Sequence, residues 1–421
     1  MKCLVVGSGG REHAIVDALA ASSAVSSVVA APGNGGMREQ AELVDIAPTD
    51  IEALIGYAEE NGVELTVVGP EVPLSLGIVD QFRARSLPIV GPTRKHALLE
   101  GSKSFTKRLC RDHGIPTASF TECTDVDEAC RVIDEGPCPV VVKADGLAAG
   151  KGVVVAGTHE EARRAARDMM EGGSLGEAGR RVVIEEFMSG EEASFHVFAD
   201  GRGFRPMPIS QDHKARFADD KGPNTGGMGA YSVDTILTEE QRTEVVERII
   251  RPTLDAMETY SGILYAGLML TADGPRLVEY NVRFGDPETQ VILPRLKTDL
   301  GDVFVAMRDG RLAALRLEWR PGAVATVVLV VDSYPGKVEK GSEITGLAEA
   351  RKISDVKVFH AGTRWEDGRV YTNGGRVLNV TAVGDSLSEA LQKAYFVAEM
   401  IDFEGKDYRS DIGQKGLRAK R

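Results

Sequence analysis

The sequence has few cysteines, no apolar run of membrane-spanning length and no recognisable leader segment. Its five cysteines contain no C-x-x-C pair, and an odd count argues against a disulfide framework. No stretch reaches the roughly eighteen apolar residues that a transmembrane helix needs. The first residues form a strand pattern and lack the apolar region and cleavage site of a signal peptide. We therefore expect a cytoplasmic protein with no membrane partner.

Paired histidines and blocks of like charge are also missing. The seven histidines show no H-x₃₋₅-H spacing, so zinc chemistry has no support. The net charge of −13 is spread along the chain, which disfavours nucleic acid as a partner. The 421 residues exceed what one hydrophobic core accommodates, and about 150 residues per domain predicts roughly three units.

The first hundred residues alternate strand and helix patterns. Strands are expected near residues 2–6, 26–34, 64–71 and 87–93, with helices from Arg11, at residues 51–60 and after residue 71. Regular alternation of this kind predicts a parallel, doubly wound α/β unit.

A glycine-rich turn, GSGGRE, follows the first expected strand. Glu12 stands where the third glycine of G-x-G-x-x-G is needed, and the second strand ends without an acid for a ribose hydroxyl, which argues against a nicotinamide site. Gly7, Gly9 and Gly10 are expected to let backbone N–H groups and the Arg11 side chain approach an anion at a helix N-terminus. Alternatively, these glycines only tighten a strand-to-helix turn.

Residues 138–157 form a strand, a glycine-rich loop and a second strand pattern. A Walker A loop is excluded because Gly146 and Gly150 enclose three residues and a glycine follows Lys151. Lys143 and Lys151 can neutralise a triphosphate under a closing loop. The alternative is a flexible hairpin with a solvated lysine.

The next strand is expected at residues 180–187 and runs into a group of acidic side chains. This pattern is reminiscent of a hinge whose backbone contacts adenine and whose carboxylate contacts ribose. Acids after a strand are usually just exposed, which is the alternative. Further on, the glycine-rich stretch 210–231 carries Asp212, Lys214 and Asn224. Its glycines indicate unusual backbone angles or close approach to a ligand, although a plain surface loop is also possible.

The stretch LVEYNVRFGDPETQ, residues 277–290, is the expected reaction centre. Glu279 and Asn281 lie two apart on a strand, so their side chains share one face and can hold one hard cation. Magnesium often needs only one or two protein ligands, because nucleotide phosphates and water complete its coordination. Arg283, Asp286 and Glu288 follow at the strand exit. The alternative is a polar loop that caps a strand.

The sequence pattern of the C-terminal part predicts a small α/β unit. Strands are expected at residues 323–333, 356–363 and 375–384, with a helix at 387–401. Asp367-Gly368 and Asn373-Gly374 are expected to form hairpin turns.

These motifs together resemble the glycinamide ribonucleotide synthetases, or phosphoribosylamine–glycine ligases, a family of ATP-grasp enzymes of purine biosynthesis. The resemblance covers the whole chain, and the combination of GGREHA, GPNTGGMGAYS and RFGDPETQ is specific to this family. The matching stretches are GSGGREHA from Gly7, VGPEVPL from Val68, GSKSFTK from Gly101, KADGLAAGKGV from Lys143, EEFMSGEEASF from Glu185, GPNTGGMGAYS from Gly222, RFGDPETQ from Arg283 and TNGGRVLNVTA from Thr372.

The resemblance implies an α/β multidomain fold. Its expected parts are an N-terminal parallel doubly wound α/β domain (1–119), a small ATP-grasp lid (120–190), an ATP-grasp core (191–320) and a small C-terminal α/β domain (321–421).

The resemblance also implies roles for individual residues. The expected ATP contacts are Lys103, Lys143, Gly150, Lys151, Glu185, Glu186, Phe187 and Glu192. The expected Mg²⁺ or Mn²⁺ ligands are Glu279 and Asn281. The expected substrate contacts are Gly9, Gly10, Arg11, Glu12, Asn224 and Asp286. The expected catalytic residues around glycine and the reacting phosphate are Asp212, Lys214 and Arg283.

The implied activity is the ATP-dependent joining of glycine to 5-phosphoribosylamine through glycyl phosphate, by a monomer. Such a reaction needs cations and positioning, not a protein nucleophile, and no nucleophile motif is found. The alternatives are another ATP-grasp carboxylate–amine ligase, a purine-pathway carboxylase and a non-catalytic nucleotide sensor.

Overall fold

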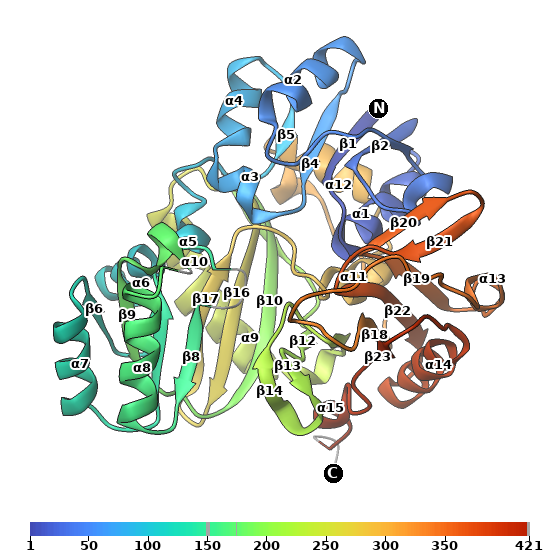
Figure 1. Ribbon diagram of the computed structural model, residues 1–421. Helices are drawn as coiled ribbons and strands as arrows, with labels where there is room; N and C mark the ends of the chain where they lie inside the picture. Colours follow the sequence, from blue (N-terminus) through green and yellow to red (C-terminus); the bar gives the residue numbers. More distant parts are fainter. Residues whose placement is uncertain (149–151, 174, 419–421) are drawn as a thin grey trace.

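The computed structural model describes residues 1–148, 152–173 and 175–418 (Figure 1). Its N-terminal part is a parallel five-stranded sheet in the order β3-β2-β1-β4-β5. The strands are β1 (Lys2–Gly7), β2 (Ser27–Pro32), β3 (Glu42–Leu43), β4 (Leu65–Val68) and β5 (Ile89–Val90). The helices are α1 (Gly10–Ala20), α2 (Ile51–Glu60), α3 (Glu71–Ser75) and α4 (Ile78–Ala84).

Alternate residues of β1 face two different cores. Leu4 and Val6 pack in the cluster that includes α2 and α4, whereas Cys3 and Val5 pack in the cluster that includes α1. Helices therefore cover both faces of the sheet, and the predicted doubly wound α/β domain is confirmed.

The second part, at the lower left of Figure 1, is an antiparallel four-stranded sheet in the order β6-β9-β7-β8. Helices α5 (Leu98–Gly101) and α6 (Lys103–Asp112) lead into it. Its elements are β6 (Phe120–Cys123), α7 (Val126–Glu135), β7 (Val140–Ala144), β8 (Val153–Ala156), α8 (His159–Met170) and β9 (Val182–Glu186). The two strands expected within residues 138–157 are present as β7 and β8, which pair antiparallel, and residues 149–151 of the expected loop lie outside the described residues.

The central part is a second antiparallel sheet, in the order β11-β10-β16-β17. Its strands are β10 (Glu191–Asp200), β11 (Phe204–Pro206), β16 (Ser261–Thr271) and β17 (Gly274–Asn281). Its helical segments are α9 (Glu239–Val245), the π-helix Val246–Ile250, α10 (Arg251–Ala256), α11 (Thr289–Ile292) and α12 (Leu300–Arg308). A separate two-stranded hairpin is formed by β13 (Ala215–Phe217) and β14 (Lys221–Asn224).

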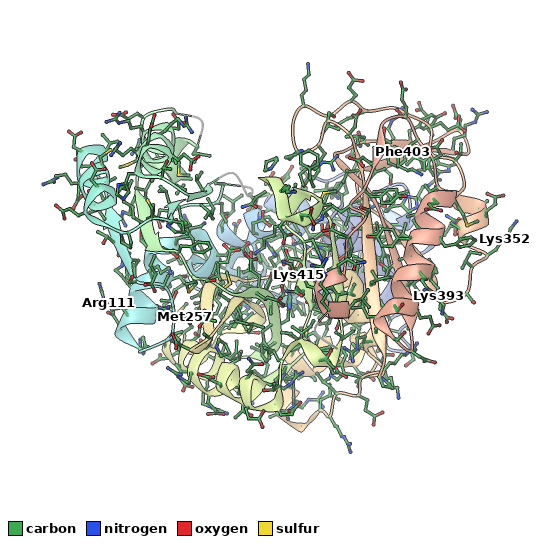
Figure 2. The ribbon with its side chains drawn as sticks, turned by 90° about the horizontal axis from the view of Figure 1, so that it is seen from below. Arg111, Met257, Lys352, Lys393, Phe403 and Lys415 are labelled. Carbon is green, nitrogen blue, oxygen red and sulfur yellow. The ribbon has the colours of Figure 1, made fainter. Side chains whose placement is uncertain are left out.

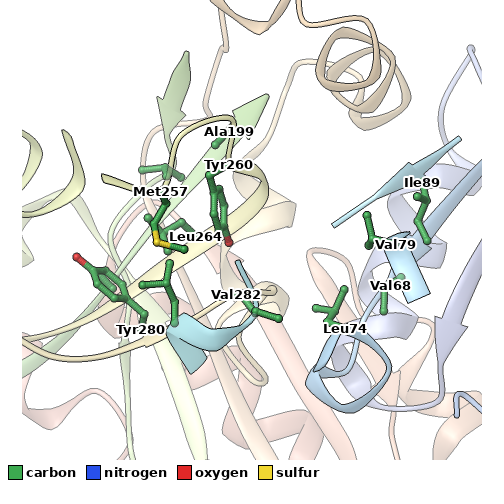
Figure 3. Close-up of a cluster of buried hydrophobic side chains, with 14 of the residues drawn as sticks. Val68, Leu74, Val79, Ile89, Ala199, Met257, Tyr260, Leu264, Tyr280 and Val282 are labelled. Carbon is green, nitrogen blue, oxygen red and sulfur yellow. The ribbon is translucent and has the colours of Figure 1, made fainter. Parts of the chain in front are cut away.

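The N-terminal and central parts share one apolar core. Figure 3 shows side chains of both in a single cluster, among them Val68 and Leu74 from the first sheet region and Leu264 and Val282 from the second. A shared core fixes the two parts relative to each other, because separating them would expose this apolar surface to water.

The C-terminal sheet has the order β12-β15-β18-β22-β19, with β23 paired to β18. Its strands are β12 (Gln211–Asp212), β15 (Gly229–Ser232), β18 (Ala323–Val331), β19 (Val356–His360), β22 (Arg376–Gly384) and β23 (Lys406–Asp407). Its helices are α13 (Leu347–Ala350), α14 (Leu387–Met400) and α15 (Gln414–Arg418). Because β15 pairs with β18, this sheet crosses the expected limit at residue 320, and the domain limits stay a prediction.

One of the two expected hairpin turns is wrong. Asp367-Gly368 does join β20 (Thr363–Glu366) to β21 (Arg369–Thr372). Asn373-Gly374 instead connects two sheets, because β21 pairs with β20 while β22 runs between β18 and β19. The N–H of Asn373 donates to the carbonyl of Gly362 at 2.7 Å, which holds this crossing in place.

Seen from below, Arg111 of α6 and Lys393 of α14 lie at opposite sides of the molecule (Figure 2).

In the ranges that the structure describes, no helix combines the length and the apolar character needed to cross a membrane.

Candidate active site

A cavity of about 700 Å³ lies where the parts of the chain meet. It is lined by most of the residues expected to bind or react, which come from the first three of the four expected domains. These lining residues are Gly9, Arg11, Glu12, Lys103, Lys143, Glu185, Glu186, Phe187, Glu192, Asp212, Lys214, Asn224, Glu279, Asn281, Arg283 and Asp286. Gly10 is not among the cavity residues, and Gly150 and Lys151 lie outside the described part of the chain.

Glu279 and Asn281 line the same cavity, at the end of β17. Burial alone would raise the pKa of Glu279, but Lys214, Lys103 and other nearby cations hold it below its usual range. Glu279 is therefore an ionised carboxylate beside a neutral amide oxygen. Within residues 1–148, 152–173 and 175–418, no three His, Cys, Asp or Glu side chains gather as a metal site. The pair fits a magnesium ion that completes its coordination with phosphates and water.

Arg283 is held at the exit of β17 by two carboxylates that sequence reasoning missed. Its Nη2 lies 2.8 Å from Oε1 of Glu100, and its Nε lies 3.5 Å from Oε2 of Glu71. Burial would lower the pKa of Arg283, but these two carboxylates keep it above its usual range. Oε2 of Glu100 also accepts a hydrogen bond from the N–H of Val282 at 2.8 Å. Glu71 belongs to the VGPEVPL stretch, so that motif contained the signal.

Asp212 and Lys214 face the cavity from the segment after β11. Nζ of Lys214 lies 2.7 Å from Oε2 of Glu192, and the pKa of Lys214 is raised by Glu192 and Asp212 despite burial. Burial raises the pKa of Asp212 to about 7, with Glu288 and Glu192 acting in the same direction. Glu192, expected at the ribose, is thus the ion-pair partner of a lysine in the structure.

Glu185 has a different environment from the expected adenine contact. Its Oε2 lies 2.9 Å from Nζ of Lys107 and 2.9 Å from Nζ of Lys143, and all three side chains are buried. The adjacent Glu186 points elsewhere and pairs with Arg276 at 2.7 Å. Lys107 was not predicted, yet it follows Lys103 by four residues on α6, a spacing that puts two side chains on one helix face.

The side chain of Glu12 folds back onto the glycine-rich turn before α1. The N–H of Gly9 donates to Oε2 of Glu12 at 2.5 Å, and Nε of Arg11 lies 2.5 Å from Oε1 of Glu12. A Cβ at Gly69 would come within 1.9 Å of Oε1 of Glu12, so this carboxylate fills the space that the glycines leave. Gly10 packs against Asn379, where a Cβ would be 2.3 Å from Nδ2. Gly9, Arg11 and Glu12 line the cavity and Gly10 does not, while the N–H of Gly9 is bonded to the carboxylate of Glu12. The anion site at this turn stays a prediction.

The C-terminal part contributes two further side chains that the sequence did not reveal as site residues. Tyr334 and Arg376 both line the cavity. Arg376 pairs with Asp286 at 2.8 Å and holds the pKa of that carboxyl below its usual range against the effect of burial. The cavity is also lined by Tyr265, Glu288 and Glu100, which come from distant parts of the chain.

Models of one enzyme family match most of the chain. The phosphoribosylglycinamide synthetase N domain matches residues 1–100, the ATP-grasp (A) domain 101–289 and the C domain 324–415. Among curated proteins, the phosphoribosylamine–glycine ligase of Vibrio vulnificus strain CMCP6 is 50% identical, covering 99% of both chains. That of Salmonella typhimurium strain LT2 is 49% identical, again over 99% of both chains.

Solved structures agree. The crystal structure of phosphoribosylamine–glycine ligase from Thermotoga maritima has a TM-score of 0.84 and 34% identity, covering 98% of this chain and 100% of that one. Biotin carboxylase from Campylobacter jejuni is similar in fold alone, with a TM-score of 0.75 and 14% identity over 96% of this chain and 92% of that one. From the family models and the full-length relatives, the chain belongs to the phosphoribosylglycinamide synthetase family.

Proposed function

We propose that this chain joins glycine to 5-phosphoribosylamine, with ATP converted to ADP and phosphate, in de novo purine biosynthesis. The carboxylate of glycine attacks the γ-phosphorus of ATP and ADP leaves, which gives glycyl phosphate. The amine of phosphoribosylamine then attacks the acyl carbon, phosphate leaves, and the amide of glycinamide ribonucleotide forms with loss of a proton. The family relationship and the residues around the cavity support this reaction.

The observation that carries the proposal is the charge arrangement around Glu279. This ionised carboxylate lies in a cavity among Lys103, Lys143, Lys214 and Arg283, whose charges lower its pKa. Both chemical steps concentrate negative charge on phosphate and carboxylate oxygens. Fixed cations in a cavity stabilise such charge more strongly than water does, because they need no reorganisation. The arrangement therefore suits phosphoryl and acyl transfer without a protein nucleophile.

In this proposal the residues divide into three groups. Lys103, Lys143 and Lys151 neutralise ATP phosphates, and residues 185–187 with Glu192 border the nucleoside. Glu279 and Asn281 would hold magnesium or manganese, which supplies positive charge to the phosphate oxygens when bound. The groups assigned to glycine and the amine substrate are Gly9, Gly10, Arg11, Glu12, Asp212, Lys214, Asn224, Arg283 and Asp286.

We further propose that the protein acts as a cytoplasmic monomer on these small molecules, without nucleic acid or membrane. Its size-exclusion mass should equal the 45.2 kDa of one chain.

The test is direct. Purified protein receives ATP, magnesium, ¹⁴C-glycine and freshly made phosphoribosylamine, and the labelled amide is separated from glycine. Amide formation that needs all components supports the proposal. ADP release that needs bicarbonate instead of glycine would favour a carboxylase, and ATP binding without ADP release would favour a nucleotide sensor.

A further inference from the structure

Arg376 begins β22 in the C-terminal sheet, yet its side chain reaches the cavity wall. The side chain is 19% exposed, and its charge is opposed by Asp286, which is also mostly buried. Burial would lower the pKa of Arg376, but Asp286 raises it above its usual range, so the guanidinium is always charged.

The guanidinium of Arg376 joins two loops that belong to other parts of the chain. Its Nη1 donates to the carbonyl of Asp286 at 2.7 Å and also to the carbonyl of Gly226. Its Nη2 donates to Oδ2 of Asp286 at 2.8 Å. Tyr334, also from the C-terminal region, accepts a hydrogen bond from the N–H of Gly226 at 2.8 Å. The planar fork of arginine is suited to such simultaneous bonds.

The first of these loops, residues 224–229, is packed tightly against the second, residues 283–288. A Cβ at Gly227 would lie 2.4 Å from Cδ of Pro287, and the φ of Gly227 is +113°, so only glycine fits there. The contact leaves no space to absorb a shift of one loop without movement of the other.

Each loop is also connected to a proposed reactive group. The N–H of Thr225 donates to the carbonyl of Lys214 at 2.8 Å, so the position of Gly226 affects the backbone of Lys214. Asp286 lies three residues after Arg283, on the turn that leaves β17. A shift of either loop would therefore move a cation at the reaction centre.

We propose that Arg376 is a positioning residue, which sets the spacing of loops 224–229 and 283–288 and thereby places Lys214 and Arg283 for the amide-forming reaction. The inference rests on the proposed function. It also gives the C-terminal part a role in the chemistry. That part supplies Arg376, which holds the two loops, while the reactive groups come from the central part.

The experiment compares Arg376→Gln and Arg376→Lys with a matched control, Arg205→Gln. Arg205 is likewise a partly buried arginine whose guanidinium donates to two backbone carbonyls of another segment, Leu315 at 3.2 Å and Ala313, but it does not line the cavity. We expect Arg376→Gln to lower kcat/KM for glycine and phosphoribosylamine roughly 10²-fold, since misplacement by about 1 Å costs that much. The KM for ATP should stay near the wild-type value.

Arg376→Lys keeps the charge but not the fork, and should fall between wild type and the glutamine variant. Arg205→Gln should keep wild-type kinetics. A readout independent of activity is hydrogen exchange, in which peptides covering residues 222–229 and 283–288 should exchange faster in both Arg376 variants but not in Arg205→Gln. Unchanged exchange in the Arg376 variants, or the same kinetic loss in Arg205→Gln, would overturn the inference. A wild-type protein that forms no amide would contradict the proposed function instead, while the exchange result still decides whether Arg376 holds the loops.

Discussion

Nη2 of Arg283 donates a hydrogen bond to Oδ1 of Asn281 at 2.8 Å. The amide oxygen expected to bind a metal is thus oriented by the cation that follows it on the strand exit. An amide oxygen has two lone pairs, so one remains for a metal ion. The negative charge at this pair comes entirely from Glu279.

The first prediction follows from that asymmetry. Glu279→Gln should lower kcat at least about 10²-fold while the fold is kept, because a neutral ligand cannot balance the charge of the ion. Steady-state kinetics across a magnesium titration measures the loss, and circular dichroism checks the fold. Asp273→Asn, an exposed change at the other end of the same hairpin, serves as the control. Near-normal turnover of Glu279→Gln at low magnesium would refute the metal assignment.

The second prediction concerns the buried carboxylate between two lysines. Glu185→Gln should lower the free energy of unfolding by about 3–5 kcal/mol, the usual result of removing one partner from a buried ion pair. The pKa of Lys107 is already lowered by burial, and loss of Glu185 leaves it beside Lys143 without a counter-charge. Urea denaturation measures the change.

Glu186→Gln is the matched control for that comparison. Glu186 and its partner Arg276 are 36% and 31% exposed, so solvent screens the pair and the expected change is about 0–1 kcal/mol. Equal losses in the two variants would show that Glu185 does not stabilise the lysine pair.

The third prediction is a pH dependence of stability from Asp212. Its pKa is raised from 3.8 to about 7 by burial, so between these values the folded protein holds a proton that the unfolded chain has lost. The contribution of protonated Asp212 to the free energy of unfolding is therefore present at low pH and is lost as the pH rises through 7. Asp212→Asn cannot titrate, and its stability relative to wild type should rise from pH 5 to pH 7, by at most about 1.4 kcal/mol per pH unit.

Urea denaturation at several pH values measures that difference, which should level off above pH 7. Asp255→Asn, at an exposed position of α10, should show no such trend. A difference between Asp212→Asn and wild type that stays constant from pH 5 to pH 8 would mean that Asp212 does not titrate in this range.

The fourth prediction concerns the intermediate. If the carboxylate of glycine attacks ATP, one of its oxygens ends in the released phosphate. Glycine labelled with ¹⁸O in its carboxylate should therefore give phosphate with one labelled oxygen per turnover, measured by mass spectrometry. Phosphate without label would rule out glycyl phosphate, even if the ligation itself occurs.

Local sequence patterns were sufficient to predict several parts of this structure. The alternation of strands and helices predicted the N-terminal domain, and the two-residue spacing of Glu279 and Asn281 on one strand predicted that their side chains reach one cavity. The spacing of Lys103 and Lys107 contained the same kind of signal, although it was overlooked. In these cases the relevant geometry is set by a few consecutive residues in one element.

Tertiary structure decided which partner each polar group has. Glu185 faces lysines from α6 and β7 instead of standing free at a strand end, and the turn at Asn373-Gly374 joins two sheets because β22 lies between β18 and β19. Arg376 meets Gly226 and Asp286 across 150 and 90 residues of sequence. Such contacts depend on how whole sheets pack, so sequence periodicity, which reports only on near neighbours, carries no record of them.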